Sequence, residues 1–188
     1  MKRIALLTLL LTAILAFSGI EGNAASVERL SLNEMAELAP TIVHGTVTDV
    51  SAAWNDEHTQ VFTTVTVRVD ESLKGRTEST ITFKQLGGTV GDTRVSVHGF
   101  PVFRSGSEVV LFLSDDPYDR IATVGLGQGK FEVYADEATG EKKVANDILG
   151  LEMFDSGKLT EASSLSMDLS ELKSNVKQAL NRSNRVTD

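Results

Sequence analysis

The stretch VFTTVTVRVD, residues 61–70, decides the fold class because its side chains alternate between two kinds. Every odd position holds valine or threonine, whereas the even positions form a mixed set that ends in Arg68 and Asp70. A period of two residues is that of a β-strand with one buried face. The pattern extends from about Thr59 to Leu73, longer than the usual run of about five or six residues. We therefore predict a bent or coiled strand, as in a barrel.

Further strands are predicted on both sides of this stretch, separated by short breakers such as Lys74-Gly75, Gly87-Gly88 and Thr139-Gly140. They are residues 42–50, 79–86, 94–98, 109–113 and 121–124, and a hairpin of residues 130–134 with 142–145. No amphipathic helix lies between these strands. The pattern therefore favours a closed or nearly closed antiparallel barrel.

Two helices are predicted, one at each end of the strand-rich region. Ser31 and Glu34 are spaced as in a capping box, in which each side chain binds the backbone N–H of the other residue. Pro40 disfavours the helical conformation just before it, so this helix should end near Leu38. A C-terminal helix starting near Ser170 would present an apolar stripe of Leu169, Leu172, Val176, Ala179 and Leu180.

The first residues have the features of a signal peptide. Lys2 and Arg3 supply positive charge, residues 4–17 are apolar apart from two threonines, and small residues follow at 22–25. The apolar run is shorter than the about 20 residues that cross a bilayer comfortably, although an uncleaved anchor is the alternative. We predict cleavage after Ala24, with Ala25 as the alternative, and a secreted or periplasmic protein. Without any cysteine, the chain cannot be a lipid-anchored lipoprotein.

Charge and cysteine content exclude several classes of function. The formal charge of −8 becomes −9 when residues 1–24 leave, because Lys2, Arg3 and Glu21 together carry +1. An acidic surface repels nucleic acid and anionic lipid, so we expect neither as a partner and favour a protein or envelope component. The absence of cysteine excludes disulfides, a thiolate nucleophile and a cysteine-built zinc site. We predict no cofactor.

A pattern of motifs runs over residues 32–134: a short helix, APTIVHGTV at 39–47, a long strand ending in Leu73-Lys74-Gly75, and an apolar strand after Gly106-Ser107-Glu108. It resembles the OB-fold barrel of netrin-like modules and tissue inhibitors of metalloproteinases, and is similar to a group of uncharacterised exported bacterial proteins. The resemblance implies a mainly β protein, an OB-like antiparallel β-barrel with a short N-terminal helix and a C-terminal helix. The inhibitors act through an N-terminal cysteine that this chain lacks, so their mechanism is not implied.

This interpretation divides the chain into three parts. Residues 1–24 are the signal peptide, and residues 25–150 are the OB-like barrel domain with its N-terminal helix. Residues 151–188 are a connector and the C-terminal helix. The connector is expected over residues 151–166, which are rich in serine, glycine and acidic side chains.

The glycine-rich stretch GLGQGK at 125–130 is not a phosphate-binding loop. Val124 stands where a Walker loop needs its first glycine, and Phe131 follows Lys130 where serine or threonine is required. We interpret it as a turn or bulge where two strands approach closely.

Metal-binding residues are scarce in the sequence. His44, His58 and His98 lie far apart and show no paired metal spacing, so we expect them to make local hydrogen bonds. The loop with Asp115, Asp116 and Asp119 offers carboxylates suited to calcium, but it lacks the glycine and terminal glutamate of an EF-hand. A solvated acidic turn is the favoured interpretation, with calcium as the alternative.

No segment carries a catalytic signature such as Gly-x-Ser-x-Gly or Ser-x-x-Lys, so we predict no catalytic residues. Aromatic side chains in or near loops are the candidates for binding: Trp54, Phe100, Phe103 and Tyr118. Loops of this kind bind partners on many OB folds, although rings that cap the barrel ends are the alternative. We predict an exported, non-catalytic binding or assembly module of the bacterial envelope or extracellular space. The alternative is a hydrolase or other enzyme with a site assembled from the dispersed histidines and acids.

Export can be tested at the N-terminus of the native protein. Mass spectrometry of the periplasmic or extracellular form should find a chain that starts at Ala25 or Ser26, because the small residues there suit signal peptidase. Recovery of chains with an intact Met1 from the cytoplasm would contradict this prediction.

Overall fold

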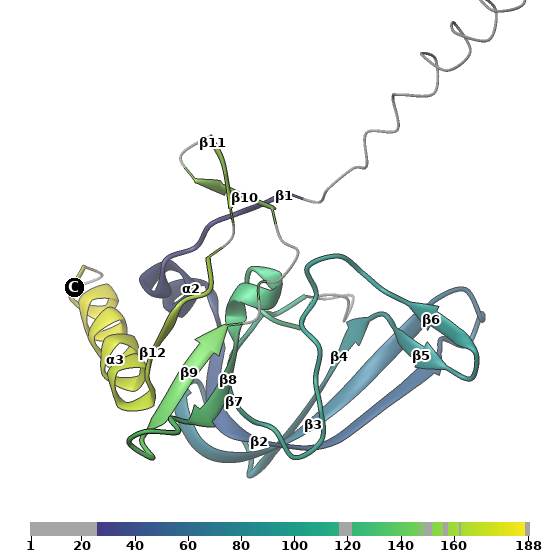
Figure 1. Cartoon of the computed structure of the whole chain (residues 1–188), viewed down its shortest axis with the longest axis horizontal. Helices are drawn as coiled ribbons and strands as arrows, with labels where there is room; N and C mark the ends of the chain where they lie inside the picture. Colours follow the sequence, from purple (N-terminus) through teal and green to yellow (C-terminus); the bar gives the residue numbers. More distant parts are fainter. Residues whose placement is uncertain are drawn as a thin grey trace, which may run out of the picture.

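A seven-stranded antiparallel sheet with strand order β12-β9-β8-β7-β2-β3-β4 forms the centre of the protein (Figure 1). The computed structural model describes residues 26–116, 122–146, 148, 152–155, 158–161 and 163–186. The strands of the sheet are β2 (Thr41–Trp54), β3 (Val61–Lys74), β4 (Thr80–Leu86), β7 (Glu108–Leu113), β8 (Lys130–Ala135), β9 (Lys142–Asn146) and β12 (Ser166–Asp168). The prediction of a mainly β protein with two helices is confirmed.

Smaller elements flank this sheet. The hairpin of β5 (Gly88–Val90) and β6 (Thr93–Val95) follows β4, and the 3-10 turn η1 (Leu126–Gly129) precedes β8. A separate sheet joins β1 (Ser26–Glu28), β10 (Glu152–Asp155) and β11 (Lys158–Glu161). The segment that we interpreted as a connector thus carries two strands of this sheet and the start of β12.

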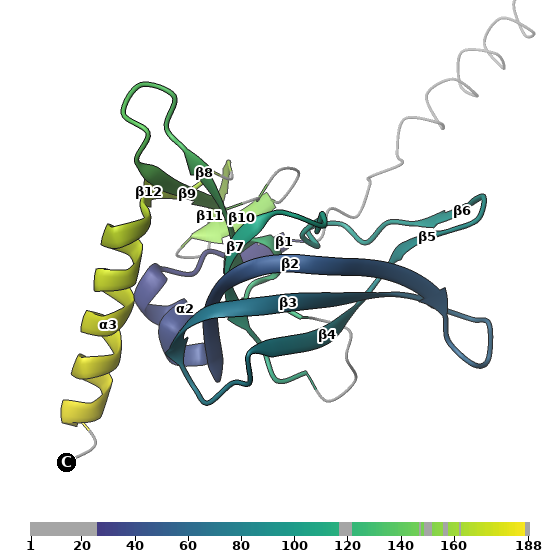
Figure 2. The ribbon, with the colours of Figure 1, turned by 90° about the horizontal axis from the view of Figure 1, so that it is seen from below.

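Both helices lie where the sequence predicts them. The helix α2 (Leu32–Leu38) begins with the capping box, in which the Glu34 N–H donates to the Ser31 hydroxyl and the Ser31 N–H donates to the Glu34 carboxylate, at 3.2 and 2.7 Å. The helix α3 (Leu169–Val186) carries the predicted apolar stripe. Figure 2 shows α2 between α3 and the first half of β2, so both helices cover one face of the sheet.

The strand β7 and the start of β2, residues 42–45, are buried on both faces. Phe112 faces the helices, whereas its neighbour Leu111 faces the opposite side, and neither is exposed to solvent. The helix-side core joins Phe112 to α2, β8 and α3 through Met35, Phe131, Leu172 and Val176. The inner core joins Leu111 to β2 and β3 through Val43, Val47, Val65 and Val67. This double burial explains why residues 109–113 are an unbroken apolar run rather than an alternation.

The long strand predicted over residues 59–73 to be bent or coiled is β3, and its pairing with β2 shifts register at three places. They lie between Ile42 and Val43, between His44 and Gly45, and between residues 47 and 49 of β2; the extra residue is on β3 at the first two and on β2 at the third. Gly45 lies so close to β3 that an added Cβ would stand 2.2 Å from the Arg68 carbonyl oxygen. Bulges of this kind bend a strand and increase its twist.

The sheet is open, so the predicted closure into a barrel is not found. In the described residues, no ladder joins β4 to β8 or β12. Residues 97–107, which we call the strap, cross the opening on the face seen in Figure 1. Phe103 of the strap enters the inner core and packs edge-on against Phe83 of β4, with ring centroids 5.5 Å apart. A strap, rather than a strand pair, covers the inner core.

The Lys74-Gly75 motif joins helix α2 to the sheet. The Lys74 ammonium donates hydrogen bonds to the carbonyl oxygens of Ala36 and Glu37 at 2.8 and 3.0 Å. These are carbonyl groups that the last turn of a helix leaves without partners. Gly75 has a φ of +79°, and a Cβ there would lie 2.9 Å from the Pro40 carbonyl oxygen. The motif therefore fixes the end of α2 against the ends of β2 and β3.

The two cores can be tested separately with neighbouring residues of β7. Leu111→Ala and Phe112→Ala should each lower the free energy of unfolding by about 2–5 kcal/mol, because each leaves a cavity in a different core. Val102→Ala is the control: its side chain is 52% exposed, and its effect should stay within about 0.5 kcal/mol. Urea denaturation followed by circular dichroism measures all three. A negligible loss from either core variant would contradict burial on both faces.

Candidate functional site

The structure separates the four aromatic residues proposed for binding. Trp54 is the last residue of β2, not part of a loop, and its ring stacks on His58 with centroids 6.4 Å apart. Phe103 is 7% exposed and belongs to the inner core, so it is a packing residue. Phe100 is half-buried on the strap, and Tyr118 lies outside the described residues.

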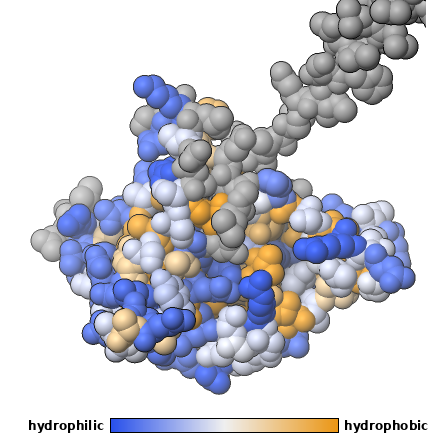
Figure 3. All heavy atoms as spheres, viewed as in Figure 1, coloured by the Kyte–Doolittle hydropathy of each residue, from blue (hydrophilic) through white to orange (hydrophobic). Residues whose placement is uncertain are grey.

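Phe100 lines a groove of about 330 Å³ between the strap and the β5–β6 hairpin. Its wall is polar and apolar in about equal parts, and the apolar side chains include Val50, Leu86, Val95, Val97 and Val102. Figure 3 shows apolar residues gathered on the face that the strap crosses. The groove is therefore a concave, partly apolar surface that a predicted binding residue lines.

Gln85 of β4 supplies an unusual polar group at this groove. Its side chain is 7% exposed, and its Nε2 donates to the Pro101 carbonyl oxygen at 2.9 Å. That bond fixes the orientation of the amide, since only the NH₂ group can donate to a carbonyl. The other amide atom, Oε1, is buried and has no hydrogen-bond partner in the described part of the chain. Leaving a buried acceptor unpaired costs about 1–3 kcal/mol, so such an atom calls for an explanation.

Lys130 of β8 holds the strap from the other side of the opening. Its side chain is fully buried, and the ammonium donates to the Val102 carbonyl oxygen at 2.7 Å and to Glu132 Oε1 at 3.0 Å. The ammonium also lies 5.5 Å from the centre of the Phe103 ring. Gln85 and Lys130 thus bind successive strap carbonyl groups. Sequence analysis did not identify Lys130 as a buried residue. Lys130 and Phe131 are successive residues of a strand, so their side chains point to opposite faces of the sheet, and Phe131 is a core residue.

The glycine-rich stretch before β8 is a structural turn, as predicted. Gly125 has a φ of +64°, and a Cβ on Gly129 would lie 2.4 Å from the Val124 carbonyl oxygen. The buried Gln128 side chain accepts a hydrogen bond from the Leu30 N–H at 2.9 Å and donates to the Glu28 carbonyl oxygen at 3.0 Å. The turn therefore anchors the segment that precedes α2.

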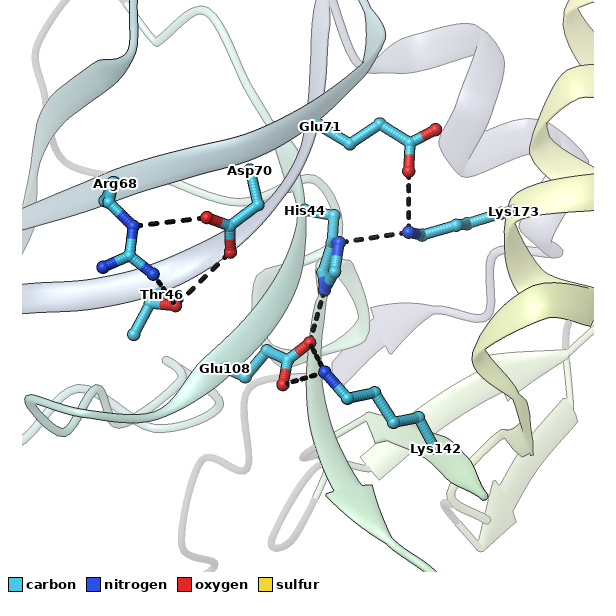
Figure 4. A network of polar contacts seen from close by, with 8 residues as sticks. All are labelled: His44, Thr46, Arg68, Asp70, Glu71, Glu108, Lys142 and Lys173. Atoms are coloured by element: carbon cyan, nitrogen blue, oxygen red, sulfur yellow. Dashed lines mark hydrogen bonds and ion pairs between the residues drawn. The ribbon is translucent and has the colours of Figure 1, made fainter. Parts of the chain in front are cut away.

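His44 lies at the centre of a polar cluster that joins four strands to α3 (Figure 4). Its Nε2 lies 2.7 Å from Glu108 Oε1, and its Nδ1 lies 3.1 Å from the Lys173 ammonium. Lys173 also donates to Glu71 Oε2 at 2.7 Å, and Lys142 donates to Glu108 at 2.7 Å. An ammonium can only donate, so Nδ1 accepts and the proton resides on Nε2, which donates to Glu108.

This arrangement makes His44 a structural group. Both ring nitrogens are engaged, which leaves no free lone pair to bind a metal or to act as a base. His58 lies beside Trp54 and His98 is exposed on the strap, so the histidines occupy three separate places. Among the described residues, no group of three or more histidine, aspartate or glutamate side chains is placed to hold a metal ion.

The acidic loop can be described only in part. Asp115 is exposed and Asp116 is half-buried, whereas Asp119 lies outside the described residues. The alternative of a calcium site in this loop stays a prediction.

The two glutamates of the cluster are held in their ionised form. The hydrogen bond from Lys173 lowers the pKa of Glu71, although partial burial opposes it. Partial burial acts to raise the pKa of Glu108, but hydrogen bonds from Lys142 and His44 outweigh it and lower the pKa overall. The contacts that hold α3 on the sheet are therefore strongest at pH values at which these two carboxylates are charged.

Comparison of the chain with protein-family models, curated proteins and solved structures gave no match. The resemblance to netrin-like barrels thus stays a prediction. Within the part of the chain that the structure describes, no helix is long and apolar enough to cross a membrane.

The cluster predicts a loss of stability in acid that depends on Glu71. A folded-state pKa below the ordinary 4.5 means that the contacts of Glu71 stabilise the fold above that pH and are lost as the pH falls through the lowered value. Thermal melting at pH 7 and pH 3.5 should therefore show a smaller acid-induced fall in Tm for Glu71→Gln than for the wild type. Glu78→Gln, at an exposed site outside the cluster, is the matched control. An equal fall in all three proteins would contradict the role of Glu71.

Proposed function

We propose that this protein is an exported, non-catalytic binding module of the bacterial envelope or extracellular space, and that the groove beside the strap is its binding site. The observation that carries the proposal is the groove itself, a concavity of about 330 Å³ that Phe100 lines together with other apolar side chains and several polar groups. Binding sites for small ligands are concave and mostly apolar, with a few placed polar groups that orient the ligand. The groove is concave and combines apolar side chains with polar groups.

The sheet also supports a relation to the OB fold, which is a five-stranded, partly open barrel. The run β8-β7-β2-β3-β4 supplies five antiparallel strands, with the bent β2 shared between β3 and β7. We propose that this is an OB-like barrel opened between β4 and β8, where the strap fills the gap. OB folds bind ligands through loops around their barrel, and a ligand groove beside that gap agrees with this.

A larger cavity, of about 590 Å³, lies between α2, β10 and α3. Its polar side chains are engaged within the protein: Gln128 binds Leu30, and the Asn146 side chain accepts from the Leu165 N–H at 2.7 Å. The Ser164 hydroxyl donates to the Asn146 carbonyl oxygen at 2.7 Å. These bonds join separate segments of the chain, so we assign this cavity to packing rather than to ligand binding.

The hydrolase alternative has less support. Among the histidines, His44 has both ring nitrogens engaged, and the other two lie on the hairpin end of β2 and on the strap. At about 3.3 Å per residue, the ten residues from His44 to Trp54 place His58 tens of ångströms from the cluster. A shared site for the three histidines is not supported.

The proposal can be tested by affinity capture from native envelope extract. A partner bound by the wild type should be retained by Trp54→Ala, whereas the amount captured should fall about tenfold or more with Phe100→Ala. Of these two residues, only Phe100 lines the groove. Equal melting temperatures would show that both variants fold. Loss with Trp54→Ala but not with Phe100→Ala would place the site at the β2–β3 hairpin instead. Hydrolase activity that disappears with His98→Ala would overturn the non-catalytic assignment.

A further inference from the structure

We propose that His44 is a pH-sensitive latch, which holds helix α3 on the sheet while its ring is neutral and loosens the helix when the ring takes up a proton. The latch lies outside the groove beside the strap, so it does not depend on the proposed binding site. Its basis is the pair of contacts that the two ring nitrogens make.

In the neutral ring, each nitrogen has one partner of the right kind. Nε2 carries the proton and donates to Glu108 Oε1 at 2.7 Å, whereas Nδ1 accepts from the Lys173 ammonium at 3.1 Å. Lys173 belongs to α3, and its ammonium also donates to Glu71 Oε2 at 2.7 Å (Figure 4). One side chain of α3 thus joins β2 and β3, and its bond to β2 requires a neutral imidazole.

A second proton on the ring places a donor opposite a donor. Nδ1 can then no longer accept from Lys173, and its new N–H points at an ammonium that lies 3.1 Å away. The negative charge of Glu108 favours the protonated ring, which allows a buried imidazole to take up the proton. Glu108 gives no new hydrogen bond in return, because the Nε2 proton binds it already in the neutral ring. The Lys173 contact is therefore the one that proton uptake breaks.

The carboxylates of the cluster are shared between donors, so neither offers the new N–H an unshared acceptor. Lys142 of β9 donates to both oxygens of Glu108, at 2.7 and 2.8 Å. Glu71 holds Lys173 and lies 3.8 Å from the Lys177 ammonium. The new N–H could reach Glu71 only in the place of Lys173. Either way, α3 loses a bond to the sheet.

The remaining charged side chains near the cluster have partners or places of their own. Arg68 and Asp70 of β3 form an ion pair with each other at 3.2 Å. Glu141 and Asp168 line a surface pocket together with Lys142 and Lys173. The exchange at the ring thus concerns the side chains that contact His44 directly.

The range from pH 7.5 to pH 5.5 isolates this step, because histidine is the side chain that ordinarily changes charge there. The hydrogen bond from Lys173 lowers the pKa of Glu71 below 4.5. Burial acts to raise the pKa of Glu108, but its bonds from Lys142 and His44 lower it overall, so both carboxylates stay ionised. Of the three histidines in the chain, His44 is buried, whereas His58 and His98 are exposed. Since docking needs the neutral ring, α3 should be held at the upper pH and loosened as the pH falls.

Hydrogen exchange followed by mass spectrometry at pH 7.5 and pH 5.5 tests the latch, with rates corrected for the chemical effect of pH. In the wild type, protection of the α3 amides should fall about tenfold or more, the factor expected for one hydrogen bond to a charged group. Protection in β7 should stay unchanged, because the apolar stripe of α3 keeps the core closed. Return to pH 7.5 should restore the protection of α3.

Two variants act on the two sides of the latch. His44→Gln puts an amide that cannot take up a proton in place of the ring, so its α3 protection should be the same at both pH values. Lys173→Gln leaves the ring in place and offers it an amide that can donate or accept. Its α3 protection should be low at pH 7.5 and should fall no further at pH 5.5. His58→Gln and His98→Gln are the matched controls, and both should respond as the wild type does.

Several results would overturn the latch. They are an unchanged α3 in the wild type, a fall in His44→Gln equal to that in the wild type, and a fall in β7 equal to that in α3, which would show general destabilisation. If His44→Gln does not fold, Lys173→Gln decides: a wild-type fall in that variant contradicts the latch, and its absence supports it.

Discussion

The central constraint on this fold is that β7 and the start of β2 are buried on both faces, so the sheet must be covered on both sides. The helices α2 and α3 cover one face with regular structure, whose backbone groups satisfy one another. The strap covers the other face as an irregular segment. Its carbonyl groups therefore need donors from the surrounding strands, and Gln85 and Lys130 supply them. Buried polar side chains in the inner core thus follow from the way the sheet is covered.

These two donors differ in how completely they are satisfied. The Lys130 ammonium is compensated by a carbonyl group, a carboxylate and an aromatic ring, as a fully buried charge requires. Gln85 has only its NH₂ group satisfied within the described residues. Within that part of the chain its Oε1 is buried as well as unpaired, so the cover satisfies the polar groups around Gln85 less completely than those around Lys130.

Local signals in the sequence predicted the elements well, and long-range contacts decided the rest. The capping box and the alternation of residues 61–70 depend on neighbours in the chain, and both appear in the structure as predicted. Trp54 pairs with Val61 and so belongs to β2, which composition alone did not indicate. Closure of the sheet into a barrel would need β4 to pair with β8. The strap lies between these strands, and within the described residues they do not pair. The His44 cluster joins residues up to 129 positions apart, so no spacing motif could reveal it.

The Lys74 contact with α2 also makes this helix depend on the sheet. A helix of seven residues is too short to be stable alone, because the first turn costs more conformational entropy than its few hydrogen bonds return. The ammonium that binds the end of α2 belongs to the last residue of β3, nearly 40 positions along the chain. The contact therefore links two parts of the chain that are far apart in sequence. The stability of α2 is thereby coupled to the pairing of β2 with β3 at the end of that hairpin.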